Sequence, residues 1–311
     1  MSYTVSEVNR RVRRDAAGFL AESDAAYQAK LADAADAVLN HVSVSPIVLL
    51  SGPSGSGKTT TAQKLEEELE RRGIQSHTIS LDNYFLDVTP EQTPRTETGA
   101  YDLESPKCLD MDLLDAHCRA LARGEEIQIP YFVFSEQKRD PDRTTPLRLR
   151  KDEIAIFEGI HALNDDITGR VPDAFKIYIS ARSNFTEGTR MVFKRTWVRL
   201  SRRAVRDYNF RGTDASTTMS GWSNVRRGEK TYITPFKKRA DLRIDTTLPY
   251  EVNILRAYAR PLFKAIPKEN QRRREMLDMI DAFGAFDPVD GALAAPDALI
   301  REFIGGGTYQ Y

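Results

Sequence analysis

The chain has 311 residues and carries 45 lysines and arginines against 45 aspartates and glutamates. Its formal charge is therefore zero, and nothing in the overall charge indicates a protein that binds nucleic acid. This length allows a substantial core, in one large or two modest domains. The two cysteines, Cys108 and Cys118, are too few for a disulfide framework and favour a reducing compartment.

The N-terminal part of the sequence shows no targeting segment. Residues 1–15 are polar and basic, and no apolar run in the chain approaches the roughly 18 residues that a bilayer span needs. These features predict a soluble cytoplasmic protein without membrane contact. Residues 5–42 are alanine-rich and predict two helices, with Ser23 and Asp24 as a cap between them. They either pack on the core or form a subunit contact, so a homo-oligomer is left open.

A phosphate-binding pattern follows the apolar run at residues 47–51. It reads Gly-x-x-x-x-Gly-Lys-Thr and precedes a helix-forming run from Ala62 to Arg72. A loop without bulky side chains lets backbone N–H groups turn toward phosphate oxygens, and the start of the next helix adds partial positive charge. A plain turn is the alternative, but the strand–loop–helix context disfavours it. We predict an ATP and Mg²⁺ site made by Gly52, Ser54, Gly55, Ser56, Gly57, Lys58, Thr59 and Thr60.

Acidic residues end two of the predicted strands. Residues 76–82 form a strand that ends in Asp82, and the strand–helix–strand order predicts a parallel sheet in which Asp82 lies near the phosphate loop. Residues 154–158 end in Glu158, where an acid can orient Mg²⁺ through water, although a solvated acid is the alternative. Strands at 175–180 and 241–245 complete an α/β fold with a parallel sheet of about five strands flanked by helices.

Further segments are predicted around this sheet. Residues 83–110 form a long turn-rich loop, which favours a functional role, and 127–150 alternate as a β-hairpin flap. A helix over 111–123 presents His117, which we interpret as structural. Helices are also expected over 250–266, 269–283 and 299–304.

Residues 188–207 predict an amphipathic helix. Phe193, Trp197, Leu200 and Ala204 share its apolar face, and the opposite face carries Arg199, Arg202, Arg203 and Arg206. Guanidinium groups suit phosphates, so we favour a lid over the triphosphate, at about residues 188–230. A solvated face and a nucleic-acid contact remain alternatives.

Together these parts favour a kinase over other nucleotide-binding proteins. Asp82 is placed to accept a proton from an attacking hydroxyl, and the arginine helix can neutralise the transferred phosphoryl group and exclude water. No Asn-Lys-x-Asp or Thr-Lys-x-Asp guanine-reading motif follows the third strand, which argues against a GTPase. The acceptor would be a small hydroxylated molecule between the 83–110 loop and the 127–139 hairpin.

Several motifs, in order and at fitting spacing, resemble the uridine kinase/phosphoribulokinase family of P-loop kinases. They are Gly52–Thr59, Leu81–Phe85, Tyr101-Asp102, Ile129-Pro130, Phe157–Ile160 and Arg202–Asp207. The segments Arg206–Gly212, Trp222, Arg227–Glu229, Tyr232–Phe236 and Arg301–Gly306 resemble its bacterial uridine kinase-like nucleoside kinase branch. The resemblance covers about residues 47–311. We expect a helical N-terminal segment at 1–44, a kinase domain at 45–267 and a C-terminal helical extension at 268–311.

The resemblance also implies roles for single residues. Lys58 and Thr59 would serve ATP and Mg²⁺, with support from Glu158. Asp82 would be the base on a ribose 5′-hydroxyl, with Lys58 and Arg206 as its catalytic partners. The remaining candidates are Arg203 and Arg211 at the phosphates and Tyr84, Asp102, Phe132, Phe134, Gln137 and Arg206 at the acceptor, with Asp102 on the ribose hydroxyls.

This sequence departs from the family where the pyrimidine is read. Phe132 stands at a Tyr position, Gln137 at a His position and Val133 at an Asp position, and Thr213 replaces a second lid arginine. Loss of a polar reader can change discrimination by orders of magnitude. An acceptor such as a sugar phosphate, bound through Lys138 and Arg139, therefore stays open, as does a regulatory module that binds nucleotide without turnover.

Overall fold

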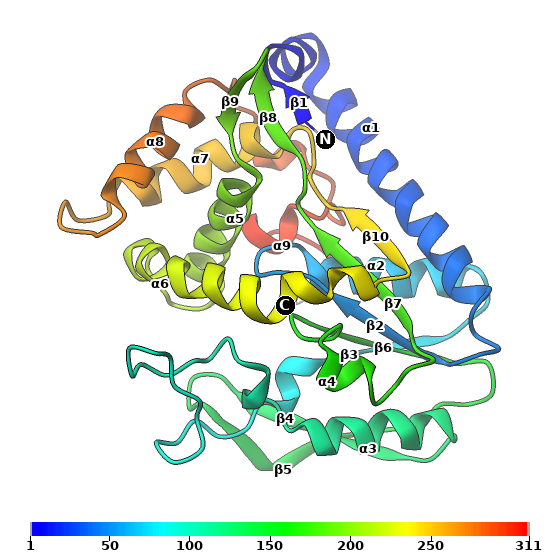
Figure 1. The fold of residues 1–311 in the computed structure, drawn as a ribbon. Helices are drawn as coiled ribbons and strands as arrows, with labels where there is room; N and C mark the ends of the chain where they lie inside the picture. The colour runs from blue at the N-terminus through cyan, green and yellow to red at the C-terminus, as the bar shows by residue number, and fades with distance from the viewer. Residues whose placement is uncertain (1, 310–311) are drawn as a thin grey trace.

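The computed structural model describes residues 2–309, and a parallel sheet stands at its centre (Figure 1). The strand order is β10-β7-β2-β6-β3, and every pairing is parallel. The predicted α/β fold with a five-stranded sheet is confirmed. The strands are β2 (Ile47–Ser51), β3 (Ser76–Ser80), β6 (Ile154–Gly159), β7 (Phe175–Ser180) and β10 (Leu242–Asp245).

Strands β2 and β6 are buried at every position. Because successive side chains of a strand point to opposite faces, Val48 and Leu50 join one apolar cluster while Ile47 and Leu49 join the other. Both faces are thus covered, which explains why the central strands read as continuous apolar runs. The first cluster includes residues of α1 (Val5–Leu39), α2 (Lys58–Arg71) and α7 (Glu251–Lys264), and the second includes residues of α3 (Met111–Ala122) and α4 (Asp165–Thr168).

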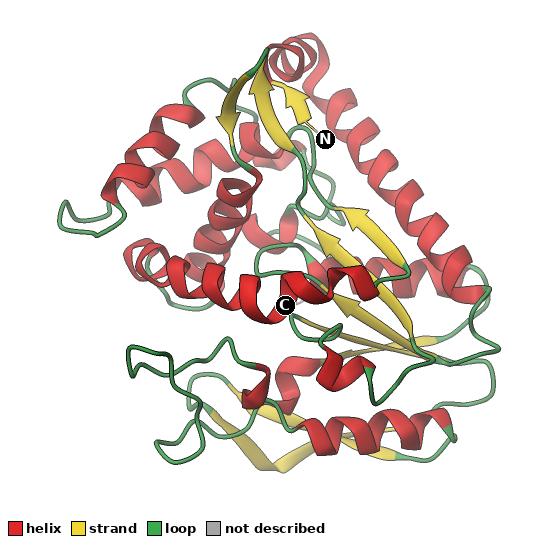
Figure 2. Cartoon of the chain, in the orientation of Figure 1, coloured by secondary structure: helices red, strands yellow, loops and turns green. Residues whose placement is uncertain are grey.

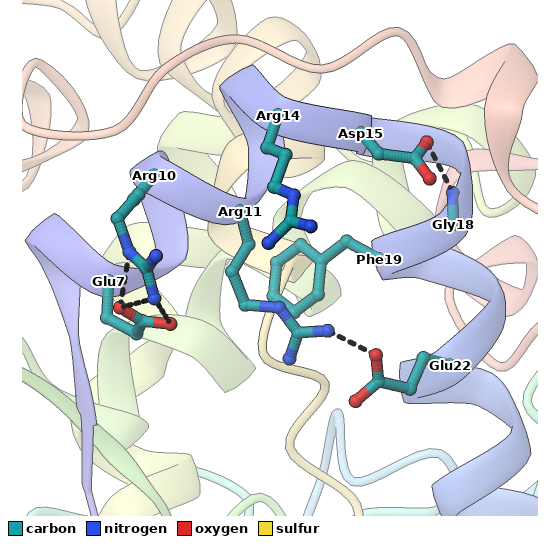
Figure 3. A pocket seen from close by; sticks show the side chains of 8 residues that line it. All are labelled: Glu7, Arg10, Arg11, Arg14, Asp15, Gly18, Phe19 and Glu22. Carbon is teal, nitrogen blue, oxygen red and sulfur yellow. Dashed lines mark hydrogen bonds and ion pairs between the residues drawn. The ribbon is translucent and has the colours of Figure 1, made fainter.

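Helix α1 is kinked, but not where the sequence predicted a break. Its only non-helical residue is Asp15, with φ −164° and ψ 91°. The Asp15 carboxylate accepts a hydrogen bond from the backbone N–H of Gly18 at 2.9 Å and so caps the second half of the helix (Figure 3). The predicted cap at Ser23 and Asp24 is wrong: Ser23 lies inside the helix, and its Oγ donates to the Phe19 carbonyl at 2.7 Å.

A second, three-stranded sheet was not predicted. Strand β1 (Ser2–Thr4) pairs in parallel with β8 (Asn184–Glu187), which pairs antiparallel with β9 (Arg190–Phe193). The turn between β8 and β9 contains Gly188 at φ +57°, a conformation that favours glycine. The helix expected to start at residue 188 therefore starts later, as α5 (Arg195–Phe210).

The predicted flap is an antiparallel hairpin of β4 (Ile127–Val133) and β5 (Lys138–Leu147), which lies apart from the central sheet at the bottom of Figure 2. The other helices of the described chain are α6 (Ala215–Gly228), α8 (Arg273–Phe283) and α9 (Arg301–Ile304). Within residues 2–309, no helix is both long enough and apolar enough to cross a membrane.

Candidate active site

The phosphate-loop pattern forms the turn between β2 and α2. Gly55 and Gly57 have φ of +71° and +85°, a region that side-chain-bearing residues rarely adopt. Close neighbours impose the same restriction. A Cβ on Gly55 would lie 2.6 Å from the carbonyl oxygen of Arg199, and one on Gly57 would lie 2.8 Å from a methyl carbon of Leu299. Gly55 and Gly57 therefore cannot be replaced by larger residues, because the lid helix leaves no room for a side chain at Gly55 and the C-terminal segment leaves none at Gly57.

Arginines of α5 hold the carbonyl oxygens of this loop. Arg199 donates to the Ser54 carbonyl at 3.2 Å, and Arg202 donates to the Gly55 and Ser56 carbonyls at 3.3 and 3.4 Å. In a trans peptide the N–H and the C=O point in opposite directions. Since the loop carbonyls point toward α5, the N–H groups of the same peptide units point away from α5. This is the arrangement that an anion-binding loop needs.

These two arginines do not lie on an open basic face. Arg199 and Arg202 are 2% and 0% exposed. Arg199 is paired with Glu229 at 2.9 Å, and Arg202 with Glu251 at 2.7 Å. The expectation that the four arginines share a phosphate-contacting face is wrong for these two, because buried carboxylates from α7 and from the segment after α6 neutralise them.

A cavity of about 180 Å³ opens beside the loop and collects residues from six separate parts of the chain. The phosphate loop, the end of β6, the long loop after β3, the flap and the lid all contribute, together with α9. The lining residues are Ser54, Gly55, Gly57, Lys58, Thr59, Asp82, Phe85, Leu103, Glu104, Phe134, Glu158, Ile160, Arg203, Arg206, Arg211 and Glu302.

Lys58 lies among carboxylates in this cavity. Burial lowers the pKa of Lys58, while the nearby Glu158 and Asp82 carboxylates act in the opposite direction. Burial likewise raises the pKa of Glu158 to about 7, with Lys58 opposing and Asp82 reinforcing the shift. The Oγ of Ser80 donates to Glu158 at 3.0 Å and fixes its orientation. A cation and two acids thus meet where the loop ends.

Glu158 and Thr59 both line the cavity, as a magnesium site would require. Hard oxygen ligands are what Mg²⁺ prefers, and it usually keeps several waters, so one carboxylate and one hydroxyl suit it. Among the described residues, no group of three or more His, Cys, Asp or Glu side chains forms a self-sufficient metal cage.

The lid contributes three arginines ordered by one buried acid. Asp207, which is 4% exposed, accepts hydrogen bonds from Arg203 at 3.2 Å and from Arg206 at 2.7 and 3.0 Å. Arg211 is 3.9 Å from the same carboxylate. Arg203 also donates to the Ser54 hydroxyl of the phosphate loop at 2.9 Å. Asp207 belongs to a quoted motif, but its role in aligning the three arginines was not predicted.

Aromatic rings and a further acid also line the cavity. Phe134 is 56% exposed, and the Arg211 guanidinium lies 6.0 Å from its ring centroid, so lid and flap approach one another there. Phe85 lines the cavity as well. Glu104 also lines it, and burial raises the pKa of its carboxyl group while the nearby Arg203 and Lys58 oppose this shift. No motif marked Glu104, because it follows the Tyr-Asp pair in an irregular loop.

Several predicted acceptor residues do not line the cavity. Tyr84 is fully buried, and its hydroxyl is hydrogen-bonded to His117 at 2.9 Å. Phe132 is 6% exposed and packs on Phe85 and Phe134 from behind. Gln137 is exposed in the hairpin turn at φ +54°. Phe85, next to Tyr84, and Phe134, two residues after Phe132, line the cavity in their place, whereas no neighbour of Gln137 does so.

Asp102 is also engaged elsewhere. Its carboxylate is 3% exposed and accepts hydrogen bonds from Arg227 at 2.5 Å and from the Tyr232 hydroxyl at 2.9 Å. Asp102 does not line the cavity. Of the loop residues predicted to bind nucleotide, Gly52, Ser56 and Thr60 are buried beneath the cavity surface, and Ser56 supports the loop through its carbonyl, which accepts from Thr246 at 2.7 Å.

Comparison with known proteins agrees with this geometry. The model of the Phosphoribulokinase / Uridine kinase family matches residues 47–252. A uridine kinase of Brevibacillus brevis is 30% identical over 204 residues, covering 64% of this chain and 84% of that protein. A uridine kinase of Schizosaccharomyces pombe is 34% identical over 165 residues, covering 53% of this chain but only 32% of that protein.

A solved structure supports the fold. A putative fructose transport system kinase from Silicibacter superposes with a TM-score of 0.51 at 20% identity, covering 69% of this chain and 98% of that one. The similarity at this identity concerns the fold alone. With the family match over residues 47–252 and the cavity described above, the chain belongs to the phosphoribulokinase/uridine kinase family and is a kinase.

Proposed function

We propose that this kinase transfers the γ-phosphoryl group of ATP to a 5′-hydroxyl of an uncharged nucleoside. The observation that carries the proposal is the set of side chains that line the cavity. The cations Lys58, Arg203, Arg206 and Arg211 line it together with the acids Asp82 and Glu104 and the aromatic rings of Phe85 and Phe134.

The phosphate loop and the cations that line the cavity suit a triphosphate. The loop N–H groups and Lys58 would hold the phosphates, and Arg203, Arg206 and Arg211 would neutralise the transferred group from the lid. Mg²⁺, held by Thr59 and supported by Glu158, would supply charge neutralisation on the phosphates when bound.

Asp82 is the candidate for the general base. It follows β3 directly, its backbone N–H is bonded to the Ser80 hydroxyl at 3.3 Å, and its side chain lines the cavity. A carboxylate in this position would accept the proton of the acceptor hydroxyl and align that oxygen for attack. Glu104 would accept hydrogen bonds from the other acceptor hydroxyls, since Asp102 is paired with Arg227.

A phosphorylated acceptor is less well supported. Lys138 and Arg139 were the cations that such an acceptor would need, but Lys138 is paired with Glu136 at 2.8 Å. Arg139 donates to Asp110 and to the carbonyls of Tyr84 and Phe85, each at 2.9 Å. Neither lines the cavity, so an uncharged acceptor that stacks on Phe134 fits better.

The base of the nucleoside is not specified by the family's usual readers. Phe132 is covered by its neighbouring rings, and Gln137 lies in the exposed turn. The rings that remain at the cavity are those of Phe85 and Phe134, and neither can read a base by hydrogen bonds. We therefore propose a broad or altered base preference rather than strict pyrimidine selection.

The test is ADP release from Mg·ATP across a panel of ribonucleosides, deoxynucleosides and phosphorylated pentoses. We expect turnover with unphosphorylated nucleosides. Lys58→Ala should weaken ATP binding and lower the rate together. Asp82→Asn should leave ATP binding intact and lower the rate by roughly 10²–10⁴, the usual contribution of a general base.

Three results would count against the proposal. Turnover of phosphorylated pentoses alone would transfer the assignment to a sugar-phosphate kinase. Full activity of the Asp82→Asn variant would remove Asp82 from the mechanism. ATP binding without turnover of any acceptor would favour a regulatory module that uses the nucleotide as a signal.

A further inference from the structure

The C-terminal segment reaches into the phosphate loop. Helix α9 packs beside α5, behind it in the view of Figure 1, and its Glu302 lines the cavity together with Lys58 and Thr59. Glu302 is 4% exposed. Its Oε2 accepts a hydrogen bond from the backbone N–H of Thr60 at 3.2 Å and another from the Thr60 hydroxyl at 2.7 Å.

These two donors belong to the anion-binding end of α2. The first N–H groups of a helix have no partner within the helix, and in a phosphate loop they are directed at the α- and β-phosphates. The N–H of Thr61 in α2 donates a helical hydrogen bond to the Gly57 carbonyl of the loop at 3.0 Å. The Thr60 N–H lies one residue earlier, and the anion bound to it is the carboxylate of Glu302.

The charge of this carboxylate matches that of a phosphate group. Burial lowers the pKa of Lys58 and raises that of Glu158, and the nearby Glu302 carboxylate acts upward on both. Glu302 is therefore close enough to influence the groups that we assign to ATP and Mg²⁺. A phosphate on the Thr60 N–H and the Glu302 carboxylate cannot occupy the same donors, and their charges repel one another.

The backbone that carries Glu302 is anchored. Leu299, Ile300 and Phe303 are at most 1% exposed and belong to the main apolar cluster. Leu299 also lies against Gly57, and the Phe303 carbonyl accepts from Asn209 of the lid helix at 3.2 Å. Displacement of the carboxylate thus requires rotation of one side chain, while α9 stays in place.

We propose that Glu302 is an internal competitor for the nucleotide: its carboxylate occupies the α-phosphate position of the loop and must leave before a nucleoside di- or triphosphate binds. The inference rests on the proposed function, because it requires a nucleotide in this loop. In the free enzyme Glu302 satisfies the N–H of Thr60 and balances Lys58. Bound nucleotide takes over both tasks, so the apparent affinity is reduced by the fraction of molecules in which Glu302 occupies the loop.

The test is calorimetric titration of ADP, with Mg²⁺, into the full-length wild type and the Glu302→Gln and Glu302→Ala variants. Both variants remove the charge, and Glu302→Gln keeps the shape of the side chain. We expect ADP to bind about tenfold more tightly to Glu302→Ala, equivalent to about 1.4 kcal/mol, with Glu302→Gln between this variant and the wild type. Unfolding midpoints without ligand show whether each variant is folded.

The matched control is Asp297→Asn. Asp297 lies in the same C-terminal segment and pairs with Lys64 of the same helix α2 at 2.7 Å, but it does not line the cavity. It should leave the ADP affinity unchanged. An equal gain in Asp297→Asn would show that loosening the segment, and not removal of the Glu302 charge, causes the effect, and would overturn the inference.

Other outcomes are equally decisive. Unchanged or weaker ADP binding in both Glu302 variants, with normal binding in the wild type, would show that Glu302 does not compete with phosphate, and would leave the proposed function intact. A wild type that fails to bind ADP, together with variants that also fail, would overturn the proposed function and this inference with it.

Discussion

The buried ion pair beneath the phosphate loop makes a quantitative prediction. Arg202 and Glu251 are both fully buried, with 2.7 Å between the Arg202 Nε and a Glu251 oxygen. Arg202 also donates to the Thr246 carbonyl at 2.7 Å. Arg202→Met would leave Glu251 with the Leu248 N–H at 2.9 Å as its hydrogen-bond donor among those described. Removal of one partner of a buried pair costs about 3–5 kcal/mol, because the other charge is left uncompensated.

The measurement is urea unfolding at pH 7. Arg202→Met should lose about 3–5 kcal/mol in the free energy of unfolding, whereas Arg202→Met/Glu251→Gln should be more stable than the single variant, since the double variant buries no unpaired charge. The exposed pair of Arg239 and Asp165, at 2.9 Å, is the control, and Arg239→Met should cost under about 1 kcal/mol. The reasoning is refuted if Arg202→Met costs no more than Arg239→Met, or if adding Glu251→Gln lowers stability further.

Two further predictions concern a buried acid and the flap. Burial raises the pKa of Asp24 to about 6 from 3.8, so the folded protein binds more protons than the unfolded chain between about pH 4 and 6, and its free energy of unfolding falls as the pH rises through that range. Asp24→Asn retains an acceptor for the Tyr250 hydroxyl and should abolish this fall in the free energy of unfolding, which is on the order of 2 kcal/mol. The measurement is the urea midpoint of both proteins at pH 4 and pH 6, and an unaltered pH profile in the variant would contradict the prediction. Phe132→Ala should cost about 3–5 kcal/mol of stability because the ring is buried, whereas the exposed Phe134→Ala should cost under about 0.5 kcal/mol yet raise the KM for the acceptor. Equal effects of the two variants on stability and on KM would be inconsistent with the assigned roles.

The sheet and the phosphate loop could be predicted because their sequence signals are local. Residues 47–51 and 154–158 are apolar runs with turn signals at each end, and these became β2 and β6. The loop pattern fixes its own backbone through Gly55 and Gly57. The edge strand β1 has no comparable signal, because its pairing with β8 joins residues about 180 positions apart in the sequence. Long-range pairing of this kind depends on partners that no local pattern identifies.

The arginine helix shows where a sequence pattern becomes ambiguous. Arg199, Arg202, Arg203 and Arg206 follow one another at helical spacing, and spacing alone assigns them to a common face. The structure divides them by the acids they meet: Glu229 and Glu251 draw two arginines into the interior, while Asp207 aligns the other two toward the cavity. Glu229 and Glu251 follow their partners Arg199 and Arg202 by 30 and 49 residues in the sequence.

The same reasoning explains why Glu302 was not recognised as a site residue. Glu302 belongs to the C-terminal motif Arg301–Gly306, which lies far in the sequence from the phosphate-binding pattern at residues 52–59. It acquires that role only because the apolar side chains of Leu299, Ile300 and Phe303 bury α9 against the core beside α2. The Glu302 carboxylate beside an anion-binding loop stabilises the free protein and opposes nucleotide binding through its charge. The packing of α9, by contrast, determines where this carboxylate lies. The contributions of charge and of packing can be separated by experiment, because Glu302→Gln removes the charge and leaves the packing of α9 in place.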